Sequence, residues 1–202
     1  MRTIIISMTL VVAGCLGCNE NVDPATPDGA LHLFRNALVA NDVPQMLAQT
    51  SAKTRTTLTA ILKHAKKQYA TIKRSYPPEY AMGAWGAYPP GVISATTLDA
   101  LFEAFIKERF EALKRGPGLT YGLSASGAPV VLGSTATVAT KSGESVPFVL
   151  EEGRWRTTVF EATLLRNLER IGLNQRTLQE NIAALKTYSK KGAPAAPKAK
   201  DR

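Results

Sequence analysis

Cysteine and histidine are almost absent from this chain of 202 residues, which contains two of each. Two cysteines cannot staple a domain of this size, so we expect packing to stabilise the fold. His32 and His64 lie far apart without motif spacing, and a structural zinc site needs four ligands. No segment has the roughly 20 apolar residues that cross a bilayer. With no glycine-rich phosphate loop and no serine nucleophile motif, we expect no metal, no cofactor and no catalytic residue.

Acidic residues are missing from residues 43 to 78, which contain seven Lys and Arg. Five of these bases are predicted to form a basic face opposite the apolar side of a helix: Lys63, Lys66, Lys67, Lys73 and Arg74. In a cytosolic protein such a face would indicate nucleic acid. Outside the cytoplasm, where we expect no nucleic acid, the available polyanions are lipid head groups and envelope polymers. A solvated face without a ligand is the simpler interpretation of the pattern.

The first fourteen residues, MRTIIISMTLVVAG, have the pattern of a secretory signal: one basic residue, a short apolar run, then small residues. The segment Val12-Ala13-Gly14-Cys15 resembles the lipobox of bacterial lipoproteins, in which the cysteine is the cleavage and acylation site. This resemblance implies a lipid on Cys15, with Cys18 as the alternative. It also implies export and anchoring at the periplasmic face of the envelope, on the outer membrane in a Gram-negative cell. Ordinary secretion and a redox Cys-x-x-Cys pair are the weaker interpretations.

Composition divides the rest of the chain into three parts. Residues 15–25 are polar at their end and predict a tether, and residues 26–188 predict a single domain with its own core. Residues 189–202 are rich in Pro, Ala and Lys and contain five basic residues and one acid. We expect this basic tail to be disordered, because it has too few apolar side chains to form a core.

Apolar residues repeat at helical spacing through the first half of the domain. Thr26 before Pro27 is typical of an N-cap, and Asp42 can cap a short helix over residues 43–49. A basic amphipathic helix follows residues 50–53. The strongest helical pattern covers residues 98–115, with Ser94 or Thr97 as its cap and Gly-Pro-Gly as its end.

Residues 75–91, SYPPEYAMGAWGAYPPG, have paired prolines near both ends, which break regular structure. Between and beside the prolines are four aromatic residues: Tyr76, Tyr80, Trp85 and Tyr88. Long irregular loops in compact domains are often functional, so these four residues form a candidate binding loop. The equally weighted alternative is that the aromatic side chains pack the loop onto the core.

Four segments rich in β-branched and aromatic residues predict strands over residues 119–123, 130–140, 145–152 and 154–160. Ser142-Gly143 and Glu152-Gly153 supply the glycine that tight hairpin turns need. Pro147 predicts an unpaired or irregular position in its strand. Residues 161–189 then predict one or two helices, with Gly172 and Asn174 as a stop and a new cap between two of them.

Helices first and strands later predict an α+β fold, with N-terminal helices packed on a C-terminal antiparallel meander and one or two helices after it. The opening TPDGALHLFRNALVANDVPQMLAQTSAKTR and the closing SVPFVLEEGRWRTTVF resemble the nuclear transport factor two superfamily of cone-shaped domains. In its exported members the closing hairpin commonly ends on Trp with a basic neighbour, which is Trp155-Arg156 here. The resemblance implies a cone with a pocket but no particular activity.

We therefore expect a non-catalytic, lipid-anchored envelope protein that binds a small apolar ligand or a protein partner. The alternative is a structural envelope protein whose basic helix and tail contact anionic lipid or glycan. An enzyme related to small-molecule isomerases or dehydratases is the least favoured class. Such an enzyme needs a carboxylate or histidine and an oxyanion donor in one pocket, and the acidic residues here have capping or surface roles.

Overall fold

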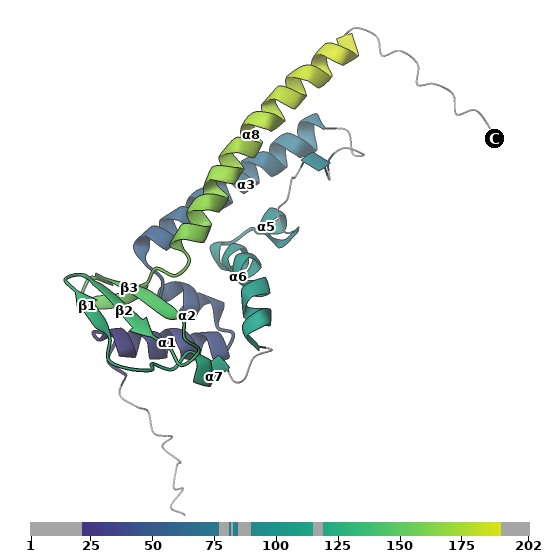
Figure 1. Ribbon diagram of the computed structural model, residues 1–202. Coiled ribbons are helices and arrows are strands. Elements are labelled where there is room, and N and C mark those ends of the chain that lie inside the picture. Colours follow the sequence, from purple (N-terminus) through teal and green to yellow (C-terminus); the bar gives the residue numbers. More distant parts are fainter. Residues whose placement is uncertain (1–21, 77–80, 82, 85–89, 115–118, 191–202) are drawn as a thin grey trace, which may run out of the picture.

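The computed structural model describes residues 22–76, 81, 83–84, 90–114 and 119–190, and its fold is α+β (Figure 1). The predicted lipidation residues, the predicted tail from 191 onward, and Tyr80, Trp85 and Tyr88 lie outside these residues. The helices before the sheet are α1 (Pro27–Val39), α2 (Val43–Ala48), α3 (Ala52–Ser75), α5 (Pro90–Ser94), α6 (Leu98–Lys114) and α7 (Leu119–Gly122). The strands and the last helix are β1 (Val130–Leu132), β2 (Thr135–Ala139), β3 (Ser145–Glu151), β4 (Arg154–Thr157) and α8 (Glu161–Lys190).

Three helices begin directly after the capping residues that the sequence predicted. Thr26 Oγ1 accepts a hydrogen bond from the Gly29 amide at 3.1 Å, and Asp42 Oδ1 accepts one from Gln45 at 3.0 Å. Of the two residues proposed for α6, Thr97 is the cap, and its hydroxyl accepts from Ala100 at 3.2 Å. Each such bond satisfies a backbone N–H that the helix leaves without a partner.

The four strands form one antiparallel sheet in the order β1-β2-β3-β4. The turn between β3 and β4 is the predicted Glu152-Gly153, with φ of 50° and 74°. Positive φ at both residues is typical of the two-residue turn whose twist matches the flanking strands. Gly143, in the other predicted turn, also has a positive φ of 83°.

Two strand predictions are wrong. Residues 119–122 form the one-turn helix α7, which ends with the Ser124 amide donating to the Tyr121 carbonyl at 3.0 Å. In so short a segment, local hydrogen bonds outweigh the strand propensity of the residues. Residues 130–140 are two strands, because Gly133 takes a φ of 61° and reverses the chain. The composition of this run does not distinguish one long strand from a tight hairpin.

Pro147 lies in β3 opposite Thr137 of β2, just before β3 begins to pair with β4 at Phe148. On the β4 side its carbonyl accepts from the Thr158 amide at 3.0 Å. The register with β2 continues unbroken through Pro147, so the predicted unpaired or irregular position is wrong. A residue without an N–H can sit here because it lies at the end of the ladder between β3 and β4.

Helix α1 separates two apolar clusters. Ala30 and Leu31 face the sheet, where they pack with Ala136, Val138, Val146, Phe148 and Trp155. Phe34 and Leu38 lie in a larger cluster formed by the helices. Phe160, just before α8, joins this cluster through edge-to-face contacts with Phe34 and Phe102, at centroid distances of 6.0 and 5.2 Å.

Helices α3 and α8 lie side by side and extend away from the sheet, and we call this pair the helical arm (Figure 1). They run in the same direction, since Ser51 contacts Glu161 at the base and Tyr76 contacts Leu178 further out. Buried residues recur at alternating spacings of four and three along α3, as in a coiled coil: Thr54, Leu58, Ile61, Ala65, Gln68 and Ile72.

The predicted break at Gly172 and Asn174 is wrong, because α8 is continuous over 30 residues. Its buried residues Leu164, Ile171 and Leu178 recur every seven residues and bury the same side of the helix. A helical glycine costs about 1 kcal/mol relative to alanine. Burial of Ile171 and Leu178 on either side of Gly172 outweighs this cost.

Candidate functional site

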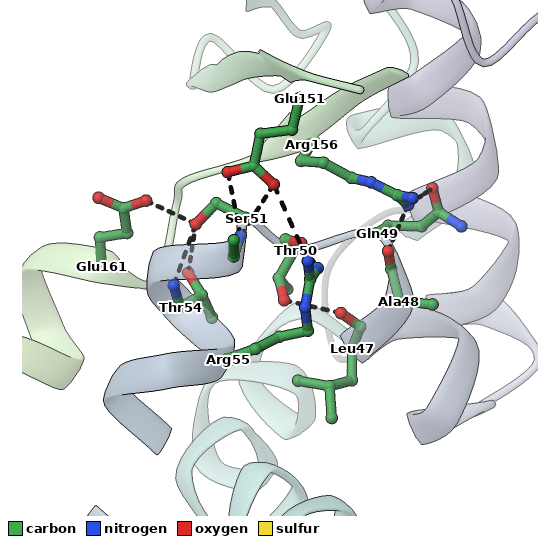
Figure 2. A network of polar contacts seen from close by, with 11 residues as sticks. Leu47, Ala48, Gln49, Thr50, Ser51, Thr54, Arg55, Glu151, Arg156 and Glu161 are labelled. Atoms are coloured by element: carbon green, nitrogen blue, oxygen red, sulfur yellow. Dashed lines mark hydrogen bonds and ion pairs between the residues drawn. The ribbon is translucent and has the colours of Figure 1, made fainter. Parts of the chain in front are cut away.

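A group of buried hydroxyls joins the base of the arm to the sheet, and we call it the polar junction: Thr50, Ser51, Thr54 and Thr157. Figure 2 shows the first three of these residues. Ser51 Oγ caps α3 by accepting from the Thr54 amide at 3.1 Å. The same oxygen lies 2.6 Å from Glu161 Oε1 and 3.0 Å from Thr54 Oγ1. Ser51 has one hydroxyl proton, and the charged carboxylate at the shorter distance is the stronger acceptor. The cap of α3 is thereby bonded to the first residue of α8.

Glu151 ties the end of β3 to the start of α3. Its two carboxylate oxygens accept from the Ala52 amide at 3.0 and 2.9 Å, and one lies 3.9 Å from the Arg55 guanidinium (Figure 2). A carboxylate is favourable at a helix N-terminus because the first amides and the helix dipole are positive there. On the other side, Lys53 forms a 3.3 Å ion pair with Glu161.

Arg156 extends the junction to α2. Its guanidinium donates to the Ala48 carbonyl and lies 3.5 Å from Gln49 Oε1 (Figure 2). Burial, together with the nearby Arg55 and Arg154, lowers the pKa of Arg156 from its ordinary value. The carbonyl bond compensates for part of that burial, so the side chain has a structural role here.

The polar junction is a structural unit. Ser51 is fully buried and its hydroxyl is used for a cap, so it is not available as a nucleophile. Serine catalysis also needs an adjacent base that can take the proton, and the group bonded to Ser51 is a carboxylate that already pairs with Lys53. The junction fixes where the arm leaves the sheet.

The junction also covers one edge of the sheet. The Thr157 amide donates to the Gln49 carbonyl at 2.9 Å, and the Ser51 amide donates to the Thr157 carbonyl at 3.0 Å. Two residues along the same edge, the Trp155 amide donates to the Pro24 carbonyl at 3.2 Å. The outer side of β4 is therefore occupied by the chain itself.

The opposite edge, β1, has three consecutive exposed apolar residues, and we call it the open edge. The exposed fractions are 62% for Val130, 49% for Val131 and 74% for Leu132. Leu150 of β3 is 39% exposed, and its amide donates to the Ser134 carbonyl in the turn that follows β1. The sequence prediction missed this edge because it treated residues 130–140 as one strand. The missed signal is Gly133-Ser134, a glycine-first pair that fits a hairpin turn.

The predicted basic face is on α3, and all five of its side chains are exposed. Lys66 donates to the Thr96 carbonyl at 2.9 Å, while within the described part of the chain the other four have no carboxylate within ion-pair distance. The basic face and the open edge belong to different parts of the fold, the arm and the sheet.

Of the four aromatic residues of the candidate binding loop, the structure describes Tyr76. Tyr76 is the C-cap residue of α3, and its hydroxyl contacts the Leu178 carbonyl of α8 at 3.4 Å. This residue therefore helps to hold the arm together, while the role of its three predicted companions stays a prediction.

Within the part of the chain that the structure describes, no group of three His, Cys, Asp or Glu side chains could hold a metal ion. No helix among the described residues is both long enough and apolar enough to cross a membrane.

Comparison with known proteins gave no match: no protein-family model, curated protein or solved structure is similar to this chain.

Proposed function

We propose that this protein is a non-catalytic, lipid-anchored protein of the bacterial cell envelope that binds a protein partner at the open edge. The observation that carries the proposal is the exposure of Val130, Val131 and Leu132 on a strand whose opposite sheet edge is covered. Edge strands in monomeric proteins are usually guarded by charge or by cover. Here no charged residue occurs from Leu119 to Thr140.

The backbone of the open edge can accept one more strand. Leu132 and Thr135 flank the two-residue turn and Val130 pairs with Thr137, so these pairs use their backbone groups within the hairpin. The N–H and C=O of Val131 then point away from β2. An extended apolar segment of a partner protein can pair there and cover the three side chains. Pro129, which has no N–H, keeps such pairing short.

The anchoring part of the proposal is supported by the signal-like residues 1–14 and by the lipobox resemblance at Cys15, with Cys18 as the alternative. Three acyl chains, as bacterial lipoproteins carry by resemblance, would give stable membrane attachment.

Site-specific photocrosslinking in the native envelope tests the partner. A photoreactive residue at position 132 should form an adduct with another protein, and one at the exposed helical position Thr59 should not. In the background of Val131→Pro, which removes the outward N–H, the adduct should be lost, whereas Val131→Thr should keep it. An adduct that contains only a second copy of this chain, or one that persists in Val131→Pro, would contradict the proposal.

A further inference from the structure

The outward face of α3 has charges of one sign. Lys63, Lys67 and Arg74 follow each other at spacings of four and seven, which places them within about 40° around the helix. We call these three residues the basic row. Ile61, Ala65 and Ile72 are buried on the opposite side, so the row is not needed for packing.

The charges of the basic row are not compensated within the described part of the chain. The ion pairs of α3 are at its base, where Lys53 meets Glu161 and Arg55 meets Glu151. Like charges four residues apart, such as Lys63 and Lys67, destabilise a helix. An anionic partner along the row would remove this repulsion.

A second line of residues lies beside the basic row. Tyr69, which is 46% exposed, has Lys66 three residues before it and Lys73 four residues after it. Around the helix, Lys66 and Lys73 lie about 80° and 100° from the middle of the basic row, and Tyr69 lies about 140° from it, near the buried side. Lys66 and Lys73 therefore flank the row, whereas Tyr69 is not on the same face.

The base of α3 is close to the point where the N-terminal segment joins the domain. Pro24 and Gln49 accept hydrogen bonds from amides of β4 that are two residues apart, and α3 begins at Ala52. Fully extended, residues 15 to 24 span about 30 Å at most. A lipid on Cys15 would therefore keep the base of α3 within reach of the bilayer surface.

We propose that α3 lies along the bilayer with its basic row on anionic phospholipid head groups. This inference rests on the proposed function in one respect: the lipid anchor is what brings the protein to a membrane. It does not depend on the proposed protein partner. Lipid anchors and polybasic surfaces are commonly combined, because the anchor gives a high local concentration of head groups for weak charge contacts. A row about 16 Å long on a straight helix presents its charges to a plane. This geometry favours a bilayer over a glycan chain.

The test uses the purified mature protein reconstituted into vesicles of phosphatidylcholine alone or mixed equally with phosphatidylglycerol. An environment-sensitive fluorophore replaces Ala70, an exposed residue between the two lines of bases. We expect its emission to shift to the blue in the anionic vesicles only. The shift should disappear at high salt, where the Debye length falls to about 3 Å.

Two triple variants separate the basic row from net charge. K63E/K67E/R74E should lower the ratio of membrane-bound to unbound α3 by at least a hundredfold, because each side chain contributes about fivefold. R166E/R170E/R176E changes three exposed bases of α8 and the net charge equally, and it should keep the shift. Circular dichroism of both variants checks that the helices remain folded.

The outcomes separate the two proposals. If the protein floats with anionic vesicles in a density gradient but does not float with neutral ones, the lipid anchor is contradicted and binding through the basic row is supported. No shift in anionic vesicles, an equal shift in neutral ones, or an equal loss in both triple variants would overturn the inference. Row-dependent binding to isolated peptidoglycan without a vesicle response would also overturn it and would identify a glycan partner.

Discussion

Gln68 of α3 donates its side-chain amide to the backbone carbonyl of Ile171 in α8 at 2.7 Å, in the middle of the arm. The carbonyl oxygen of the same side chain accepts from Asn174 at 3.3 Å. Gln68 is 1% exposed. A buried polar residue at such a position fixes the register of two helices, because sliding one helix leaves its hydrogen bonds unmade.

Replacement of Gln68 by alanine should lower the free energy of unfolding by about 2 kcal/mol, because it removes a buried hydrogen-bonded side chain and leaves a cavity. The control is Gln179→Ala at an exposed position of α8, which should change stability by less than about 0.5 kcal/mol. Chemical denaturation measures both. Equal effects of the two substitutions would show that the Gln68 bonds do not stabilise the arm.

Gln175 should respond in the opposite direction. Its side-chain Oε1 is buried and has no hydrogen-bond partner among the described residues. It lies on the same side of α8 as the buried Ile171 and Leu178, four residues after the first and three before the second. Gln175→Leu should therefore raise the free energy of unfolding by about 1 kcal/mol, since it removes an unsatisfied polar atom and adds apolar packing. A decrease in stability would indicate that the amide is satisfied in solution.

Ser51 is expected to contribute more than an ordinary cap, because it also bonds to Glu161. Ser51→Ala should cost about 2 kcal/mol, whereas Thr97→Ala, which removes only the cap of α6, should cost about 1 kcal/mol. Thermal unfolding of the two variants gives the comparison. If Ser51→Ala costs no more than Thr97→Ala, the bond from α3 to α8 adds nothing to stability.

Two glycines should give opposite results when replaced by alanine. A Cβ at Gly172 would meet no atom within 4 Å in the middle of α8, so Gly172→Ala should stabilise by about 1 kcal/mol. Gly153 has a φ of 74°, so Gly153→Ala should destabilise by about 1 kcal/mol. Their difference in denaturation midpoint checks both the continuous helix and the turn.

Capping and turn chemistry were the most predictable part of the fold. Thr26, Asp42 and Thr97 cap the helices that their side chains predicted, and Glu152-Gly153 forms the predicted turn. These features depend on a few neighbouring residues, which is the range over which a sequence pattern acts.

Features that depend on distant contacts were not predictable. The continuity of α8 through Gly172 depends on burial against the rest of the arm, and local propensity predicted a break. Ser51 was not singled out in the sequence because its partner, Glu161, is 110 residues away. The basic face was visible because charge on the outward side of a helix is itself a local pattern.

Lipid anchoring can be measured directly by a mass spectrum of the N-terminal peptide, from protein purified out of its native membrane fraction in detergent. We expect residues 1–14 to be absent and Cys15 to carry acyl chains. Acylation of Cys18 would keep the envelope anchor and move only the cleavage site. An unlipidated N-terminus with both cysteines free or oxidised would contradict the claim of a lipid-anchored envelope protein.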